Sequence, residues 1–373
     1  MERWKHWLKI GLLAVAFIPL SLSLSAAGWG GNDDYRTSRM PQGNAITDPQ
    51  AILQYALPIE NNAVRRVQSS LEDMATHLRA RRRWFAVASD VRSVKSVLAY
   101  RREDLLESVP PEQRAEGKVK LDEIDSGATE LEAAVEAQDR EQTWQLRRQL
   151  LNLLGDFEAL MVEDFPFEVP PEYANLPQLK GRATVEMTTD KGTISIVVDG
   201  YNAPVTGGNF VDLVQRGFYD GLPFVRAEDN YVLQVGDPPG SEDGFVDPNT
   251  GEERTIPLEI RVRSENEPIY GFTLEEIGLY REQPVLPFSA YGTVAMAHRD
   301  SDVNSASSQF FFFLFEPELT PAGLNLLDGR YAVFGYVVDG AKVLERLAKG
   351  DPIRTARVVE GLENLVVPEA PAA

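Results

Sequence analysis

A proline-rich segment near the middle of the chain most strongly limits how it can fold. Residues 166–181 contain Pro166, Pro170, Pro171 and Pro177. Because the proline ring fixes φ and removes a backbone donor, this stretch cannot continue a helix and stiffens the chain. We therefore predict a linker over 166–181, one domain over 47–165, a second domain over 182–368 and a short tail over 369–373. A chain of 373 residues is long enough for both domains to bury a core.

The part before the linker carries helical patterns. Apolar residues recur every three or four positions in four stretches, which begin near Val64, Val91, Leu121 and Asp139. The second stretch is expected to be one helix that contains Leu105 and ends before Pro110. Each apolar stripe can be buried only against its neighbours, and the connections are short. Residues 47–165 are therefore expected to form an antiparallel four-helix bundle.

An arginine cluster follows the first of these helices: Arg79, Arg81, Arg82 and Arg83. Positive charge is favourable near a helix C-terminus, so a solvated helix end is one interpretation. The other is that the cluster docks onto an acidic partner or onto the acidic second domain within the same chain.

The first 27 residues resemble an export signal. Arg3, Lys5 and Lys9 precede an apolar run, and the small residues of 25–27 would suit cleavage after Ala27. Residues 28–46 are polar and lack apolar periodicity, so we expect a flexible leader there. An uncleaved anchor is the alternative, but the apolar run is shorter than the roughly 20 residues that a span requires. We expect no stable membrane span in the mature chain.

Composition excludes several kinds of chemistry. The chain has no cysteine and three histidines, so a thiolate nucleophile, a disulfide or a zinc centre built on cysteine is excluded. The net charge of −20 opposes binding to a phosphate backbone, and we expect no nucleic-acid partner. No metal site and no cofactor are predicted. Residues 247–253 have the oxygen-rich composition of a calcium loop, but the order of residues favours a turn.

The part after the linker has β patterns. Residues 184–187 and 193–198 are rich in β-formers and are separated by Asp190, Lys191 and Gly192, which predicts a hairpin. A short helix is expected after Pro204, with Phe210 towards the core and its end at Gly217.

Seven segments of this part, in order, resemble the cyclophilin family of peptidyl-prolyl isomerases: 209–210, 217–221, 224–226, 233–237, 296–298, 308–311 and 327–335. Their shared order and spacing make the resemblance specific. It implies a closed antiparallel β-barrel with flanking helices, and hence a multidomain protein of an α part and a β part.

The resemblance also implies a prolyl site. Arg226 occupies the position of the family's catalytic arginine, and Gln234 follows eight residues later, where it could hold the guanidinium. A guanidinium directed at the prolyl nitrogen weakens the conjugation behind the isomerisation barrier of about 18–20 kcal/mol. The expected substrate-binding residues are Tyr231, Val232, Ala297, Gln309, Phe311, Leu327 and Tyr331. Gln309 and Phe311 would share one face of a strand, whereas Phe310 and Phe312 would face the core.

Three positions depart from the family pattern. Val225 stands where a histidine usually precedes the catalytic arginine, Tyr331 replaces the pocket histidine, and Leu326 replaces a tryptophan. Two hypotheses therefore remain open. One is an active isomerase, and the other is a chaperone or scaffold that binds proline-containing segments with little turnover.

The arrangement of signal, helical domain, linker and cyclophilin-like domain resembles the multidomain lumenal cyclophilins of cyanobacteria and chloroplasts. The resemblance implies a location in the thylakoid lumen or the periplasm. It also implies proline-containing clients, among them photosystem II subunits, and a role in assembling or maintaining that complex.

Overall fold

The computed structural model describes residues 46–368 except 81–82, 163–164, 249 and 316–324. The predicted signal peptide, the leader up to residue 45, the tail, and Arg81 and Arg82 of the arginine cluster lie outside the described residues. No helix within the described ranges is long and apolar enough to cross a bilayer.

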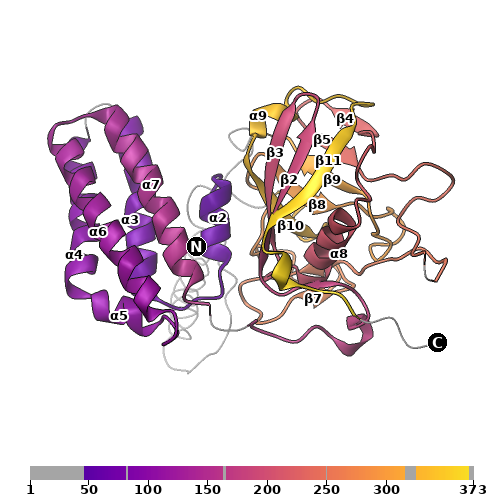
Figure 1. Cartoon of the computed structure of the whole chain (residues 1–373), viewed down its shortest axis with the longest axis horizontal. Coiled ribbons are helices and arrows are strands. Elements are labelled where there is room, and N and C mark those ends of the chain that lie inside the picture. The colour runs from indigo at the N-terminus through magenta and orange to yellow at the C-terminus, as the bar shows by residue number, and fades with distance from the viewer. Residues whose placement is uncertain (1–45, 81–82, 163–164, 249, 316–324, 369–373) are drawn as a thin grey trace, which may run out of the picture. The chain divides into compact units, whose positions relative to one another are not determined.

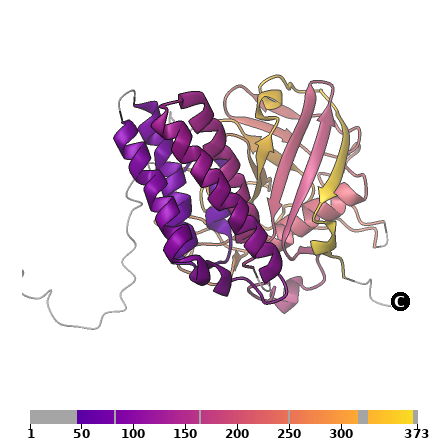
Figure 2. The same ribbon diagram turned by 60° about the vertical axis from the view of Figure 1, so that its left-hand side comes forward.

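Four long helices share one apolar core: α3 (Asn62–Arg79), α4 (Trp84–Tyr100), α6 (Arg114–Glu136) and α7 (Arg140–Ala159). They run lengthwise beside one another (Figures 1 and 2). The predicted stripes form that core: Leu71, Met74, Ile124 and Leu131 are fully buried. Side chains cap two of the starts. The Asn61 carboxamide oxygen accepts from the backbone N–H of Val64, and the Asp139 carboxylate accepts from that of Gln142.

The prediction of a single helix from Val91 to Leu105 is wrong. The helix ends at Tyr100, and a short helix α5 (Arg102–Glu107) follows after Arg101. No glycine or proline marks this break. The change of direction buries Leu105 and Val109 in the same core as α3, so tertiary packing overrides local helix preference.

Two elements outside the predicted second domain pack with its strands: one joins the apolar core, and the other forms a separate two-stranded sheet. Helix α2 (Pro49–Ala56) contributes Ile52, Leu53 and Ala56 to the apolar cluster of the sheet. In the linker, β1 (Gln178–Leu179) follows the short 3-10 helix η1 (Pro171–Tyr173) and pairs with β12 (Leu365–Val366).

The second domain is an eight-stranded, curled antiparallel sheet (Figure 1). Its order is β11 (Ile353–Glu360), β2 (Arg182–Thr189), β3 (Gly192–Asp199), β10 (Val333–Asp339), β8 (Thr293–Met296), β9 (Phe310–Phe313), β5 (Val232–Val235) and β4 (Arg226–Glu228). The predicted hairpin is confirmed as β2–β3. Full barrel closure is not: β4 and β11 are edges that do not pair as strands, although Pro223 and Pro352 form a bridge beside them.

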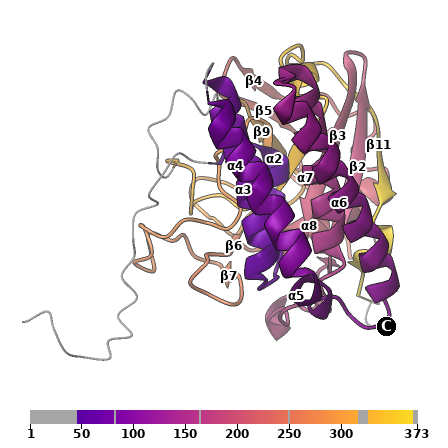
Figure 3. The ribbon, with the colours of Figure 1, turned by 90° about the vertical axis from the view of Figure 1, so that its left-hand side faces the viewer.

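Helix α8 (Pro204–Gln215) follows β3 as predicted, and Gly217, with φ of 69°, ends the turn after it. Phe210 of α8 packs on Phe310, Tyr219 and Phe334, which are all fully buried. The remaining elements are helix α9 (Ala341–Leu344), the 3-10 helix η3 (Leu362–Asn364) and a separate hairpin of β6 (Glu259–Ile260) and β7 (Ile269–Tyr270), seen in Figure 3.

Candidate active site

Eight of the nine predicted site residues line one hollow of about 130 Å³ on the second domain. The ninth, Gln309, lines an adjoining hollow of about 120 Å³ that shares Gln234, Ala297 and His298 with the first. We call the first hollow the prolyl groove and the second the side pocket. The prolyl groove is lined by Arg226, Tyr231, Val232, Gln234, Ala297, His298, Asp300, Phe311, Leu327 and Tyr331.

Arg226 and Gln234 lie directly opposite each other on β4 and β5. Their predicted contact is not what the structure shows. The Arg226 guanidinium instead bonds the Glu228 carboxylate at 2.7 Å, and both side chains are 48% exposed. A charge-assisted bond to a carboxylate is stronger than one to a neutral amide, which explains the choice of partner. The bond to Glu228 raises the pKa of Arg226 further, so the guanidinium stays charged.

Gln234 positions Gln309 rather than Arg226. Its amide nitrogen donates to the Gln309 carboxamide oxygen at 2.8 Å. The Gln309 amide in turn donates to the Asp237 carboxylate at 3.1 Å and to the Asp243 carbonyl at 2.8 Å. Gln309 is therefore held at the junction of the prolyl groove and the side pocket. A fixed amide there can bond the backbone of a bound peptide.

Aromatic rings form one wall of the prolyl groove. Phe311 is 6% exposed and meets Tyr331 edge-on, with ring centroids 5.4 Å apart. Phe288 stacks on Phe311 at 6.1 Å, and His298 stacks on Tyr331 at 4.5 Å. Such a wall offers an apolar face to a proline ring. Phe310 and Phe312 are fully buried on the other face of β9, as predicted.

Charges surround the side pocket and the mouth of the groove. Arg299 lies 3.4 Å from the carboxylates of Asp243 and Glu253, and Asp300 lines the prolyl groove. Burial raises the pKa of Asp237, and the nearby Asp243 raises it further. Asp328, next to Leu327, is half-buried and accepts the backbone N–H groups of Phe288 and Asn325. Burial nevertheless raises its pKa to about 6.

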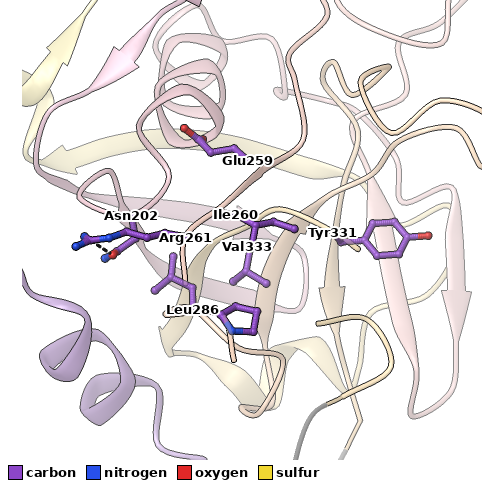
Figure 4. Close-up of a pocket in the computed structure, with 8 residues that line it drawn as sticks. Asn202, Glu259, Ile260, Arg261, Leu286, Tyr331 and Val333 are labelled. Carbon is purple, nitrogen blue, oxygen red and sulfur yellow. Dashed lines mark hydrogen bonds between the residues drawn. The ribbon is translucent and has the colours of Figure 1, made fainter. Parts of the chain in front are cut away.

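A third hollow does not suit a peptide. It holds about 10 Å³, room for about one water. Figure 4 shows Glu259 directed towards a helix and Arg261 bonded to Asn202. Glu259 accepts the backbone N–H groups of Val205 and Thr206, so it satisfies donors at the start of α8. This hollow therefore serves the packing of the fold.

Near the predicted turn, the Gly251 N–H donates to the Asp247 carbonyl at 2.8 Å, as in a turn. No group of three potential metal-ligating side chains occurs in the described part of the chain. Residue 249 is not among the described residues.

Four side chains at the groove were not predicted: Glu228, Phe288, His298 and Asp300. Glu228 follows Arg226 at the two-residue spacing that places side chains on one face of a strand. Its position beside Arg226 could therefore have been predicted from the sequence. Phe288 comes from a loop far away in sequence, and no local pattern places it on Phe311.

Comparisons with known proteins agree with this geometry. Residues 184–364 match the family described as cyclophilin type peptidyl-prolyl cis-trans isomerase. Residues 48–162 match the description "Peptidyl-prolyl cis-trans isomerase CYP38-like, PsbQ-like domain".

Three curated relatives extend over most of the chain. A putative thylakoid lumen peptidyl-prolyl cis-trans isomerase of Synechocystis is 55% identical over 97% of this chain and 96% of its own length. The chloroplastic isomerase CYP38 of Arabidopsis thaliana is 45% identical over 87% of this chain and 77% of its own length. The chloroplastic CYP37 of the same plant is 33% identical over 85% of this chain and 70% of its own length.

The two family matches and the long relatives confirm the resemblance seen in the sequence. This chain belongs to the cyclophilin-type peptidyl-prolyl cis-trans isomerases, in the group that carries a PsbQ-like helical domain before the cyclophilin domain.

Proposed function

We propose that this isomerase works in the thylakoid lumen on proline-containing segments of photosystem II subunits, and that it assists their assembly or maintenance. The relatives named for the thylakoid lumen or the chloroplast support the location. The signal-like residues 1–27 support export. The observation that carries the client class is the prolyl groove, which Arg226 lines together with the aromatic pair Phe311 and Tyr331.

The groove supports turnover as well as binding. A guanidinium near the prolyl nitrogen stabilises the twisted amide of the transition state more than the planar ground state. The chemistry requires no nucleophile, metal or cofactor. Isomerisation is a rotation about the prolyl peptide bond. The site therefore needs only a charged donor, an apolar pocket for the proline ring and hydrogen-bonding groups for the peptide backbone.

A second candidate function is a chaperone that binds proline segments with little turnover. The bond between Arg226 and Glu228 favours it, because an engaged guanidinium offers less of its charge to a substrate. Val225 and Tyr331, which depart from the family pattern, favour it too.

Two measurements test the proposal. Cross-linking in the native compartment, followed by identification of the captured proteins, should recover photosystem II subunits through the prolyl groove. Capture should weaken in a Phe311→Ala variant, which removes part of the apolar wall. Capture of other lumenal proteins, with photosystem II subunits absent, would contradict the proposed clients. Cis–trans exchange of a proline peptide then separates the two functions: binding without faster exchange supports the chaperone.

The helical domain is proposed as the module that meets partners, or that docks on the second domain and limits access to the groove. A charge-reversed variant, Arg79→Glu with Arg83→Glu, tests the second arrangement. If the arginine cluster docks on acidic residues of the second domain, the variant exchanges proline peptides faster than the native chain. An unchanged rate assigns the cluster to a solvated helix end.

A further inference from the structure

His298 makes contacts that a neutral imidazole cannot satisfy together. It follows β8, lies half-buried at the boundary of the prolyl groove and the side pocket, and stacks on Tyr331. Its Nδ1 lies 3.0 Å from the Arg299 carbonyl oxygen, and its Nε2 lies 3.0 Å from the Arg330 carbonyl oxygen.

Both partners are acceptors. A neutral imidazole carries one N–H and one lone pair, so in either tautomer one ring nitrogen would face a carbonyl oxygen without a proton between them. The imidazolium carries two N–H groups and donates to both. The face of Tyr331 also attracts a cation. Two hydrogen bonds and a ring contact therefore favour the same protonation state.

The two carbonyls belong to different loops. Arg299 is in the loop after β8, and Arg330 is in the loop before β10. Those strands are paired, and the Met296 N–H donates to the Ala332 carbonyl at 3.0 Å where they meet. A ring that bonds both loops fixes the wall of the groove, because Tyr331 lies between His298 and Phe311.

We propose that His298 is a positioning residue of the prolyl groove that acts in its protonated form, joining the loop after β8 to the loop before β10 and holding Tyr331 against Phe311. When the ring loses a proton, one of the two bonds becomes a contact between lone pairs. The ring then turns, and Tyr331 loses its support. The competent groove is therefore the form with the protonated ring, and activity falls when the ring loses its proton.

The charged groups around His298 permit this. Three arginines are near, and each is paired: Arg226 with Glu228, Arg299 with Asp243 and Glu253, and Arg330 with Glu275. Because each guanidinium is paired with a carboxylate, it repels the imidazolium of His298 less strongly. The remaining titratable groups on the adjoining elements are Tyr231, Asp300, Asp302, Asp328 and Tyr331. Asp328 can also make activity depend on pH, since its pKa is about 6, so it needs a control of its own.

The first test is a pH profile of kcat/KM for a proline peptide. The native protein should lose about fivefold between pH 5.5 and pH 8, which corresponds to about 1 kcal/mol, the net strength of one ordinary hydrogen bond. His298→Gln keeps one donor and does not titrate, so its profile should be flat near the high-pH rate. His77→Gln, on α3, and Asp328→Asn should both keep the step. A step that survives in His298→Gln, or is absent from the native protein, overturns the proposal.

A second test does not depend on turnover. Nitrogen NMR of the histidine rings reports protonation directly, and comparison with His298→Gln assigns the signals. At pH 5.5 both ring nitrogens of His298 should carry protected protons, and the affinity for the peptide should be about fivefold higher than at pH 8. Rapidly exchanging ring protons at pH 5.5, together with equal affinity at both pH values, would exclude the bridge.

Discussion

Arg226 lies at the edge of the prolyl groove with its guanidinium half exposed. Arg226→Ala removes the donor that is proposed to stabilise the twisted amide, so kcat/KM for a proline peptide should fall by about 10²–10³. The dissociation constant of the same peptide should change little, because the apolar wall remains. Exchange spectroscopy on a peptide at equilibrium gives the rate, and titration gives the affinity.

Arg354→Ala is the matched control for that substitution. Arg354 is an exposed arginine on β11, paired with Asp190 and absent from the residues that line the groove. Its loss should leave exchange unchanged. Equal rates for Arg226→Ala and Arg354→Ala would show that the guanidinium of Arg226 takes no part in the rotation.

Glu228 is expected to restrain Arg226. Glu228→Gln removes the carboxylate that engages the guanidinium, and the freed charge can then approach the prolyl nitrogen. The pair is about half exposed, and such pairs contribute about 0.2–1 kcal/mol, so kcat/KM should rise by about 1.5- to 5-fold. Glu186→Gln, an exposed glutamate of β2, serves as control. A fall in kcat/KM for Glu228→Gln would instead assign Glu228 the role of orienting Arg226.

The residues of the groove were predictable, but their partners were not. Strand spacing and family position bring Arg226, Gln234, Phe311 and Tyr331 to one hollow. Whether the Arg226 guanidinium bonds Glu228 or Gln234 depends on charge and on side-chain rotamers. The strand register alone does not determine this. The two carbonyls that meet His298 come from loops whose paths no local sequence pattern specifies.

At the scale of elements, a buried acid joins helices α3 and α7. Glu158 of α7 is fully buried, and its carboxylate lies 3.4 Å from the Arg65 guanidinium of α3. Burial raises the pKa of Glu158 to about 8, and the opposing effect of Arg65 is smaller. Below that pH the carboxyl is mostly neutral, so the contact is a hydrogen bond rather than an ion pair.

The stability of the helical domain should therefore depend on pH. Because the pKa of Glu158 is higher in the folded than in the unfolded chain, the native state binds more protons between about pH 4.5 and 8. The free energy of unfolding then decreases as pH rises through that window. Glu158→Gln mimics the neutral acid, so it should raise the free energy of unfolding at pH 8 by about 1–3 kcal/mol and change it little at pH 5.

Denaturant melts at pH 5 and pH 8 test this, with the exposed Glu130→Gln on α6 as control. If Glu158→Gln destabilises the protein equally at both pH values, the carboxylate is charged in the native state and the interaction with Arg65 is a true ion pair.

Helix positions followed from apolar spacing, whereas helix ends followed from packing. The stripe that contains Leu71 and Met74 is fully buried. A three-four pattern over 18 residues defines a single apolar face of the helix, and that face must pack against neighbouring helices. The break at Arg101 and the placement of α2 on the sheet were not predictable in that way. Both depend on apolar residues finding a partner surface that is distant in sequence.

At the scale of the molecule, the proline-rich segment predicted a boundary between a helical part and a β part, because proline limits the backbone whatever surrounds it. Barrel closure depended instead on the pairing of β4 with β11. Those strands are 125 or more residues apart along the chain, and no pattern in either strand specifies the other as its neighbour.

The net charge of −20 should affect how clients reach the groove. Arg299 pairs with Asp243 and Glu253, Arg226 pairs with Glu228, and Asp300 lines the groove, so carboxylates outnumber these arginines at the mouth. A peptide with lysine beside the proline should be attracted over a longer range than one with glutamate, and its kcat/KM should be higher by about tenfold at low ionic strength. The difference should shrink as salt shortens the screening length from about 30 Å at 0.01 M to about 8 Å at 0.15 M. Exchange rates for lysine, glutamate and alanine versions of one peptide over that range measure the effect, and the alanine version should be insensitive to salt. A preference for the glutamate peptide would show that the electrostatic potential at the mouth is positive. In that case Arg226 and Arg299, rather than the carboxylates, determine which clients enter.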